Sequence, residues 1–349
     1  MSYAKQLEFK ATTIKNEFKI KNLDIIKSKE IHFRNRAEFR IFHEDDRIFY
    51  AMHSFDKKLL KIDECLITSP AIYKIMPKLL KELSLNNQLK RKLFAVEFLS
   101  SSTNNLLITL IYHKKIDQLW REEAEKLATK LKIDLIGRSK KVKKVITKES
   151  IDESFKIENI SYKYFLKDNS FIQPNAFVNQ QMIKWVCKNI KNLDSDLLEL
   201  YCGHGNFTLP LSKKFKKVLA TEISKSSIKL AKEHVKLNNI TNIEFVRLSS
   251  QELIEALQQT RVFKRLRDID LKKYNFSHIF VDPPRAGVDE KTLKFLKEFK
   301  NIIYISCNPK TLKRDLEILK DKFKIVQFAI FDQFAYTNHV ECGVILTQK

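Results

Sequence analysis

Hydrophobic and polar residues alternate in two different rhythms along this chain. From His32 to Phe42 the residues HFRNRAEFRIF alternate strictly, with Phe33, Phe39 and Ile41 on one face and arginines on the other. A period of two residues predicts a half-buried strand. HEDDR then predicts a turn and IFYAM a returning strand, and LFAVEFL and LLITLIYHKK predict a second hairpin joined by SSSTNN.

The rest of the first part predicts one helix and one further strand. IDQLWREEAEKLATKLK carries Leu119, Leu127 and Leu131 at helical spacing, which predicts an amphipathic helix. KIDLIG predicts the strand. Residues 1–160 are therefore expected to form a smaller α+β domain with β-hairpins.

From about Leu197 the rhythm changes to strand, helix, strand. LLELYC, KVLATEIS, NIEFVRL, SHIFVDPP and NIIYISC predict five strands with helical segments between them, and KIVQFAIF and VECGVIL predict two more. This succession is typical of a parallel sheet covered by helices. Residues 161–349 are expected to form an α/β domain, with ISYKYFLKDNSFIQPN as the connecting region.

Charge adds a partner to this picture. The chain carries 65 Lys and Arg against 42 Asp and Glu, a net charge of +23, which favours a polyanionic partner. We rank nucleic acid above a membrane surface, because no basic amphipathic helix with a bulky aromatic face stands out. Residues Arg34, Arg36 and Arg40 share one face of the first strand. That face could follow a phosphate backbone, although an ordinary solvated face explains it nearly as well.

Cysteine usage and the first residues indicate the compartment. Five scattered cysteines without C-x-x-C spacing favour a reducing environment and argue against a zinc or iron–sulfur site. The sequence MSYAKQLEFKATTIKNEF has no apolar signal core, and no apolar stretch is long enough to span a bilayer. We expect a cytoplasmic protein.

A glycine loop predicts a nucleotide-like ligand. Gly203 and Gly205 are two of only five glycines, and they lie between a predicted strand and helix, in ELYCGHGN. Glu222 ends the next strand, where a carboxylate can accept both hydroxyls of a ribose. The third glycine of the dinucleotide fingerprint is missing, and Asn206 and Phe207 leave little room for a pyrophosphate. S-adenosylmethionine (SAM), which has a ribose and no phosphate, therefore fits better than NAD.

Three further residues lie at strand ends or within a strand of the predicted sheet. Asp282 precedes two prolines after an apolar strand, where it could present its carboxylate to a planar base. Cys307 lies before the N-cap Asn308, where a helix N-terminus favours the thiolate, although a small buried hydrophobe is about as good an interpretation. Glu341 begins an apolar strand, where it either pairs with an arginine or acts as a base.

Together these groups suggest one reaction. Attack of a thiolate on carbon 6 of a uracil makes carbon 5 nucleophilic, so that carbon 5 can take a methyl group and then lose its proton to a base. The chain resembles the RNA uracil-5-methyltransferase family of the TrmA type, in its tRNA (uracil-5-)-methyltransferase branch. The stretches that carry the resemblance are SFIQPNAFVNQQM, DLLELYCGHGNFTLPL, LATEIS, IFVDPPRAG, YISCNP and FDQFAYTNHVECGV, with RNRAEFRIFHEDD, LIYHKK and LIGRSKK in the first half.

The resemblance implies a fold and a set of roles. A C-terminal class I SAM-dependent methyltransferase domain (Rossmann-like) would follow an RNA-binding domain, with Cys307 as nucleophile and Glu341 as proton acceptor. Arg285 would contact the target nucleotide. The SAM site would comprise Gln173, Tyr201, Asn206, Glu222 and Asp282. Two positions depart from the family pattern, Ala335 in place of proline and His204 in place of asparagine.

The resemblance also implies a substrate. The family's tRNA members methylate the T-loop uridine (nucleotide 54) to ribothymidine, so we expect the tRNA T-arm as partner, with no metal, no iron–sulfur cluster, no membrane and no obligate protein partner. Ribosomal RNA members typically carry an extra N-terminal domain and a cysteine-ligated cluster, whereas RNRAEFR begins here at Arg34 and the first half has one cysteine, Cys65. A 23S rRNA uridine methyltransferase is the alternative. A non-catalytic tRNA-binding or folding factor is a second one, and the intact pair of Cys307 and Glu341 argues against it.

Overall fold

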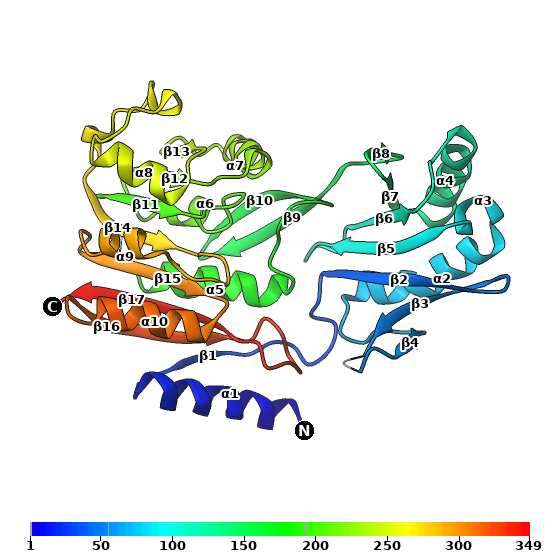
Figure 1. The fold of residues 1–349 in the computed structure, drawn as a ribbon, viewed down its shortest axis with the longest axis horizontal. Helices are drawn as coiled ribbons and strands as arrows, with labels where there is room; N and C mark the ends of the chain where they lie inside the picture. The colour runs from blue at the N-terminus through cyan, green and yellow to red at the C-terminus, as the bar shows by residue number, and fades with distance from the viewer. Residues whose placement is uncertain (1, 55, 192) are drawn as a thin grey trace. The chain divides into compact units, whose positions relative to one another are not determined.

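The computed structural model describes residues 2–54, 56–191 and 193–349, and these form two compact units (Figure 1). The larger unit comprises Met1–Ser28, Phe155–Lys163 and Phe177–Lys349, and the smaller unit comprises Lys29–Ser154 and Tyr164–Ala176. The predicted division at residue 160 is therefore wrong in one respect. The first residues belong with the C-terminal part, because β1 (Asp24–Ile26) pairs in parallel with β16 (Phe323–Phe331).

The larger unit is built on an eight-stranded sheet in the order β1-β16-β17-β15-β14-β11-β12-β13. Five neighbouring strands are parallel, and β17 runs antiparallel to both β15 and β16. This confirms the predicted α/β class. The remaining strands of this sheet are β11 (Asp196–Leu200), β12 (Val218–Thr221), β13 (Ile243–Val246), β14 (Phe276–Val281), β15 (Asn301–Ser306) and β17 (Glu341–Gln348).

Helices cover both faces of this sheet. On one face, buried residues of α1, α8, α9 and α10 form a core with alternate strand residues such as Leu198, Ile279 and Tyr304. On the other face, Trp185 of α5 meets the Phe331 ring at 5.5 Å. The helices of this unit are α1 (Tyr3–Phe18), α5 (Ala176–Lys188), α6 (Thr208–Leu211), α7 (Lys225–Leu237), α8 (Ser250–Leu257), α9 (Glu290–Leu296) and α10 (Pro309–Leu319), with 3-10 turns at Lys264–Leu266 and Leu271–Lys273.

The smaller unit is a seven-stranded sheet in the order β4-β3-β2-β5-β6-β7-β8, and both predicted hairpins are confirmed in it. Its strands are β2 (Arg36–Glu44), β3 (Arg47–His53), β4 (Leu59–Ile62), β5 (Leu93–Ser100), β6 (Leu106–Tyr112), β7 (Asp134–Ser139) and β8 (Val142–Val145). Its helices are α2 (Pro70–Leu85), α3 (Asn87–Lys90) and α4 (Gln118–Leu131). One face of the sheet forms a core with α2 and α4.

The buried stripe of α4 differs from the predicted one. Leu119 is 64% exposed, whereas Trp120 is completely buried. Gly137 of β7 makes this possible, because a Cβ there would lie 2.1 Å from the Trp120 ring. The stripe therefore begins at Trp120, one position after the predicted leucine.

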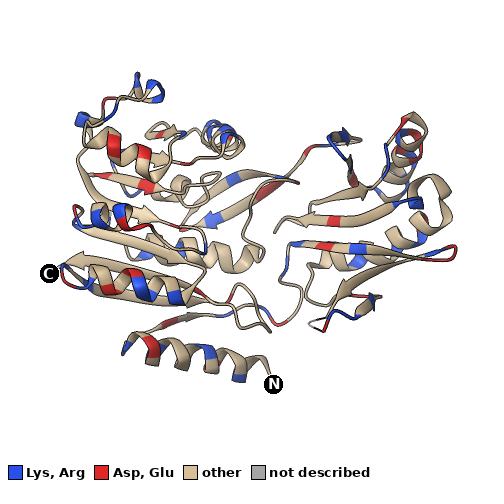
Figure 2. Ribbon diagram, in the orientation of Figure 1, with Lys and Arg blue, Asp and Glu red and all other residues tan. Residues whose placement is uncertain are grey.

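Residues 150–167, which include the start of the predicted connecting region, form regular structure. They form a two-stranded sheet of β9 (Ser150–Ile157) and β10 (Ile160–Lys167). Lysines and arginines lie on elements of both units and are interleaved with acids (Figure 2). Among the described residues, no helix is both long and apolar enough to cross a membrane.

Candidate active site

The register of the larger sheet places four polar residues on one face at its edge. Phe280 of β14 pairs with Glu199 of β11 on one side and with Ile303 of β15 on the other. Because side chains alternate along a strand, Asp282 and Cys307, each an even number of residues further on, continue on the face of Glu199. The sheet therefore brings the strand ends that carry the predicted loop carboxylate and thiol to one edge.

The antiparallel strand β17 adds Glu341 to this face. Gly343 pairs with Ile305, so Glu341, two residues earlier, lies at the level of Cys307. Cys342 points the other way into the core and is fully buried. Cys307 and Glu341 therefore share the candidate site, whereas the cysteine beside Glu341 does not.

The surroundings of the Cys307 thiol favour its protonated form. Burial raises its pKa to about 11, with the charges of Glu341 and Asp282 acting in the same direction and Arg285 opposing them. Cys307 does precede a helix N-terminus as predicted, since the Asn308 side chain accepts the Lys310 N–H at 3.2 Å. The pKa of the thiol is nevertheless raised, because burial and two carboxylates outweigh the effect of that N-terminus.

Glu341 is a buried carboxyl without an ion-pair partner among the described residues. It is 4% exposed, and its Oε2 atom makes no hydrogen bond. Burial raises its pKa to about 8, helped by Asp282 and opposed by Arg285. Arg285 therefore lowers the pKa of Glu341 through its charge, without forming an ion pair. The Oε2 atom of Glu341 remains available for a reacting proton.

The loop after β14 carries Asp282 and Arg285 and is fastened to α10. Burial raises the pKa of Asp282 to about 7. The Arg314 guanidinium donates to the carbonyl oxygens of Ala286 and Val288 at 3.2 and 3.1 Å. Asp315, which is fully buried, accepts the Val288 N–H at 3.0 Å. These contacts fix the path of the loop between Asp282 and the start of α9.

Arg285 has a partner that the sequence did not predict. Its guanidinium lies 3.1 Å from Nδ1 of His339, and its carbonyl accepts from the Asn308 side chain at 3.0 Å. Both Arg285 and His339 are exposed. The only sequence signal for His339 is its place two residues before Glu341.

The glycine loop and Glu222 form the predicted cofactor edge. Glu222 accepts the Gly203 N–H at 3.2 Å and the Ser224 N–H at 2.8 Å. Gly203 and Gly205 both have positive φ, of 55° and 89°. A Cβ at Gly203 would meet nothing within 4 Å, so the space above this loop is open. Carboxylate oxygens have further lone pairs, so Glu222 can still accept hydroxyls of a ribose.

Two more loop residues are held from the side. Tyr201 has a φ of 60°, and its hydroxyl donates to Ser250 at 3.2 Å. Asn206 and Asn179 exchange two amide hydrogen bonds of 2.8 and 2.9 Å. These hydrogen bonds hold the loop in place.

His204, the residue that replaces asparagine, braces the loop from within. Its carbonyl lies 2.9 Å from Nδ1 of His234, and a carbonyl can only accept, so Nδ1 must carry the proton. Burial, followed by the neighbouring His234, lowers the pKa of His204 to about 3. The His204 ring therefore stays neutral at any working pH.

Glu199 was missed by the sequence reasoning. It is 1% exposed, and its Oε2 atom makes no hydrogen bond. Burial raises its pKa to about 8, with the neighbouring Thr208 hydroxyl lowering it and the charge of Asp282 raising it. An acid inside an apolar strand is the same signal that singled out Glu341, and it was available in LLELYC.

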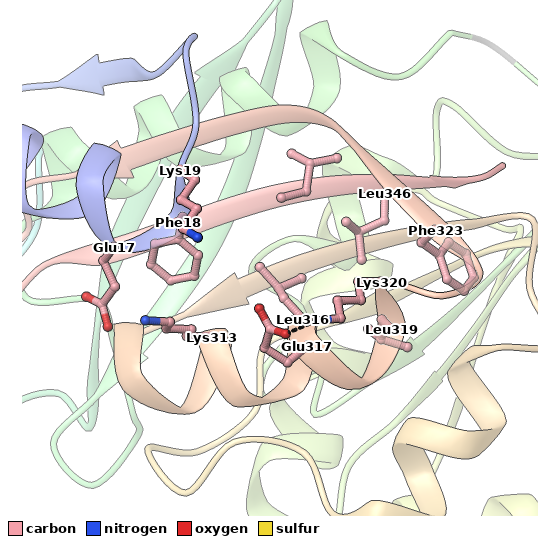
Figure 3. A pocket seen from close by; sticks show the side chains of 11 residues that line it. Glu17, Phe18, Lys19, Lys313, Leu316, Glu317, Leu319, Lys320, Phe323 and Leu346 are labelled. Atoms are coloured by element: carbon pink, nitrogen blue, oxygen red, sulfur yellow. Dashed lines mark hydrogen bonds and ion pairs between the residues drawn. The ribbon is translucent and has the colours of Figure 1, made fainter.

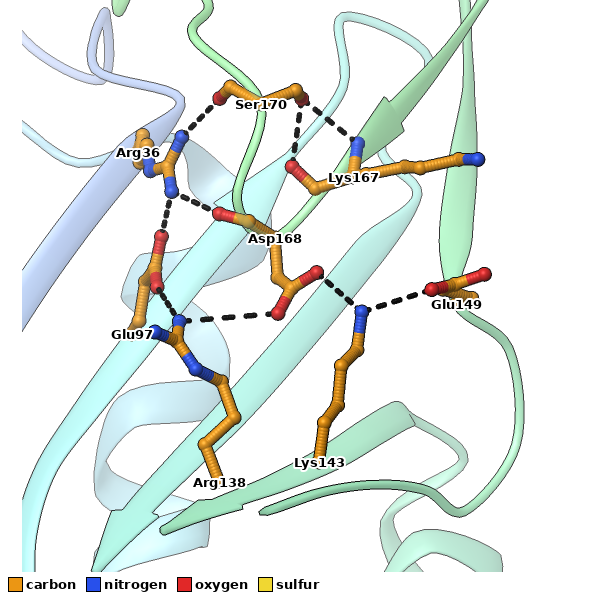
Figure 4. A network of polar contacts seen from close by, with 8 residues as sticks. All are labelled: Arg36, Glu97, Arg138, Lys143, Glu149, Lys167, Asp168 and Ser170. Atoms are coloured by element: carbon orange, nitrogen blue, oxygen red, sulfur yellow. Dashed lines mark hydrogen bonds and ion pairs between the residues drawn. The ribbon is translucent and has the colours of Figure 1, made fainter. Parts of the chain in front are cut away.

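The remaining predicted residues lie in the smaller unit. Gln173 is half-buried in the segment between β10 and α5. Arg36 is bound in a polar network in which it contacts Glu97, the Asp168 carbonyl and the Ser170 carbonyl (Figure 4). Arg34 donates through Nε to the Arg36 carbonyl at 2.8 Å.

Arg40 differs from both. It is exposed, and its guanidinium lies 3.8 Å from the centre of the Phe94 ring. The three arginines of the predicted face are therefore not equivalent, because Arg36 is held inside the unit by carboxylate and carbonyl groups whereas Arg40 faces solvent.

The fold and the site together define a SAM-dependent methyltransferase. An open glycine loop follows one strand, and an acid follows the next strand, at the edge where α/β sheets bind ligands. The chain belongs to the tRNA (uracil-5-)-methyltransferase family, whose model matches residues 2–349.

Individual relatives agree with the family. The chain is 52% identical to a tRNA/tmRNA (uracil-C(5))-methyltransferase of Aliarcobacter butzleri, over 99% of this chain and 94% of that protein. It is 47% identical to the protein of the same description from Acinetobacter baumannii strain ACICU, over 99% and 98%. The crystal structure of Pyrococcus abyssi tRNA (uracil-54, C5)-methyltransferase in complex with S-adenosyl-L-homocysteine has a TM-score of 0.77 at 22% identity, covering 99% of this chain and 84% of that one, which confirms the fold.

Proposed function

We propose that this protein methylates carbon 5 of the T-loop uridine of tRNA, nucleotide 54, to ribothymidine, through a covalent bond between Cys307 and carbon 6 of the uracil. The observation that carries the proposal is the pairing of Cys307 and the unpartnered, buried Glu341 on one face of the sheet. The relatives named above supply the tRNA uracil as substrate class.

The chemistry follows from the two side chains. The Cys307 thiol first loses its proton to solvent, and the thiolate sulfur then bonds to carbon 6, which breaks the carbon 5–carbon 6 double bond and moves its electron pair onto carbon 5 and the adjacent carbonyl oxygen. SAM supplies the methyl group that carbon 5 takes. Glu341 then accepts the proton of carbon 5, the double bond reforms, and the carbon–sulfur bond breaks to release Cys307. A pKa near 8 makes the Glu341 carboxylate basic enough to take the proton, although the carboxyl group is mostly protonated at neutral pH and must be ionised when the proton of carbon 5 is removed.

The cofactor site of this proposal uses the residues of the glycine-loop edge. Glu222 would accept the ribose hydroxyls, and Tyr201 and Asn206 would bound the loop around the ligand. Asp282 would face both the cofactor and the uracil, since it lies on the face of Cys307. Gln173, from the segment before α5, is assigned to the cofactor by the family pattern alone.

The nucleotide side of the site would be bound by exposed polar side chains. Arg285 and His339 lie together next to the Cys307 edge and are free to meet a phosphate or a base. In the smaller unit, Arg40 is placed to follow the RNA backbone, whereas Arg36 supports the fold. We propose that the protein works in the cytoplasm, where tRNA is available, and without an obligate protein partner.

The test is to incubate the protein with labelled SAM and with separate pools of tRNA and rRNA, and to map the labelled nucleotide. The proposal predicts label in tRNA, at the T-loop uridine. Label in 23S rRNA alone would point to the ribosomal alternative. Stable tRNA binding without any transfer of label would point to a non-catalytic binding factor.

A further inference from the structure

The N-terminal helix α1 is fastened to the loop that leads into Glu341, through residues 322 positions apart in the chain. Lys10 donates to Asp332 Oδ1 at 2.7 Å and to the Phe334 carbonyl at 3.2 Å. Lys10 is 5% exposed and Asp332 is fully buried. Charged residues are almost never buried unless they are paired, so this ion pair is a specific feature of the helix.

A second contact holds a strained residue of the same loop. Tyr336 has a φ of 64°, which is unfavourable for a residue with a side chain. Its N–H donates to the Gln6 side chain at 2.7 Å, and its ring lies 5.6 Å from that of Tyr3. Gln6 and Tyr3 both belong to α1, so the helix stabilises the conformation in which the loop is bent.

The loop thus held connects the proposed base to the proposed nucleotide contact. Phe331 ends β16 and pairs with Glu341 at the start of β17, so Asp332–Val340 spans the turn between them. His339, near the end of the turn, contacts Arg285 and lies 5.7 Å from the Phe334 ring. A shift of this turn would therefore move both His339 and the backbone that enters Glu341.

Helix α1 is itself anchored to the sheet. Ala11 and Ile14 are buried in the core on the face opposite to Cys307, and the Phe18 ring lies 5.0 Å from that of Phe328. Beyond Phe18 a cavity of about 280 Å³ separates the end of the helix from α10, lined by Lys313, Lys320 and neighbouring residues (Figure 3). The cavity contains none of the site residues, so the link between α1 and the site is made through Lys10, Gln6 and Tyr3.

We propose that α1 acts as a clamp on the β16–β17 turn, and that Lys10 is a positioning residue for the step in which Glu341 removes the proton. This inference rests on the proposed function. It predicts that loosening the clamp slows release of the covalent bond more than its formation, because Cys307 lies between β15 and α10, and neither element takes part in the contacts of Lys10, Gln6 and Tyr3 with the turn.

The test compares Lys10→Met with Lys214→Met, in full-length protein and with a complete tRNA. Lys214 also makes a lysine ion pair, 2.7 Å from Glu158, with 12% of the lysine side chain exposed, but with a partner that is about half exposed and is not a residue of the site. Turnover is measured with labelled SAM, and protein covalently joined to RNA is measured on denaturing gels. Thermal unfolding midpoints show how far each variant is destabilised. The Asp332→Asn variant and the double variant Lys10→Met/Asp332→Asn complete the set.

The clamp predicts that Lys10→Met lowers turnover by about 10- to 100-fold, as expected for a small misplacement of a reacting group, and accumulates a methylated covalent complex. The double variant should be no slower than either single one, because both remove the same contact. It also provides the test if Lys10→Met does not fold, since it leaves no unpaired buried charge.

Two results would overturn the clamp. One is turnover in Lys10→Met equal to that of Lys214→Met, and the other is a parallel loss of adduct and turnover. Failure of the proposed function is recognised separately, because Glu341→Gln would then trap no complex either, and the clamp would fall with it.

Discussion

At the scale of single residues, the reactivity of Cys307 depends on the charges that surround it. Glu341 and Asp282 raise its pKa and Arg285 lowers it. A pKa of about 11 favours the protonated thiol at neutral pH, so Cys307 must lose its proton before attack. The groups that set this balance can be altered one at a time.

Replacing Glu341 and Arg285 should move Cys307 in opposite directions. Glu341→Gln removes a negative charge, lowers the thiol pKa and should speed alkylation of Cys307 by iodoacetamide at pH 9. Arg285→Ala removes a positive charge and should slow it. Each pKa unit changes the thiolate fraction about tenfold, so several-fold effects are expected. Peptide mass spectrometry measures Cys307 separately from Cys65, and equal rates in both variants would contradict the account.

The buried carboxyl groups make stability depend on pH. Glu199 has its pKa raised from 4.5 to about 8 on folding, so between these values the folded protein keeps a proton that the unfolded chain has lost. Stability from this group is therefore fully present below pH 4.5 and is lost as the pH rises through 8. Asp282 and Glu341 act in the same direction.

Glu199→Gln should weaken this pH dependence, because the amide cannot ionise. The thermal unfolding midpoint of the unaltered protein should fall between pH 5 and pH 8, and the variant should show a smaller fall. Midpoints recorded at pH 5, 6.5 and 8 for both proteins decide the matter. An equal fall in the two proteins would mean that Glu199 is ionised in the folded state.

The sequence predicted some of these residues and not others, for physical reasons. Cys307, Asp282 and Glu341 each stand where an apolar strand begins or ends, and strand ends of a parallel sheet meet at one edge. The contact between Arg285 and His339 depends on how two loops meet, which no local pattern encodes. The burial of Arg36 depends on Glu97 and Asp168, which come from distant segments.

At the scale of elements, the loop after β14 depends on a glycine. Gly287 has a φ of 78°, and a Cβ there would lie 2.7 Å from the Arg314 guanidinium and 2.9 Å from the Asp315 carboxylate. These are the groups that hold the loop. Gly203 also has a positive φ, but a Cβ there would meet nothing within 4 Å.

Alanine at these two glycines should therefore give different phenotypes. Gly287→Ala should destabilise the protein by more than the roughly 1–2 kcal/mol of backbone strain, because it also displaces Arg314 or Asp315. Gly203→Ala should cost only the strain but should obstruct the open loop and weaken SAM binding. Thermal unfolding and calorimetric titration with SAM measure the two effects. A larger loss of stability in Gly203→Ala than in Gly287→Ala would contradict this account of the two loops.

Elements whose hydrophobic residues recur at regular spacing were predicted from the sequence. Elements in which this spacing is interrupted were not. The hairpins of β2, β3, β5 and β6 alternate regularly and were found as expected. Helix α2 contains Pro77 in its interior, and α1 has the buried Lys10 within its apolar stripe, so neither shows a simple helical pattern. The reason for that lysine, a carboxylate 322 positions away, becomes visible only in three dimensions.

At the scale of the whole molecule, the excess of positive charge can bind RNA only through side chains that reach solvent. Arg40→Ala should weaken tRNA binding and reduce the slope of log affinity against log salt by about 0.7–0.9, with little effect on stability. Arg36→Ala should instead lower the unfolding midpoint, because Glu97 and Asp168 lose a partner, at a cost on the order of 3 kcal/mol. Binding titrations at several salt concentrations separate the two, and an unchanged slope for Arg40→Ala would make its face an ordinary solvated one.

The assignment of the first residues to the larger unit also went beyond what the sequence indicated. The change of rhythm near Leu197 identified the parallel sheet, but β1 is only three residues long and carries no pattern of its own. Its pairing with β16, together with the buried contacts of α1, returns the start of the chain to the unit that contains Cys307 and Glu341.

The central claim, that Cys307 attacks and Glu341 removes the later proton, is tested most directly by trapping the covalent complex. With unmodified tRNA and labelled SAM, Glu341→Gln should form a methylated protein–RNA complex that survives denaturing electrophoresis, whereas Cys307→Ala should bind both substrates and form none. Cys342→Ser provides the control, because Cys342 points into the core on the opposite face. A full-strength complex from Cys307→Ala, or none from Glu341→Gln, would contradict the account.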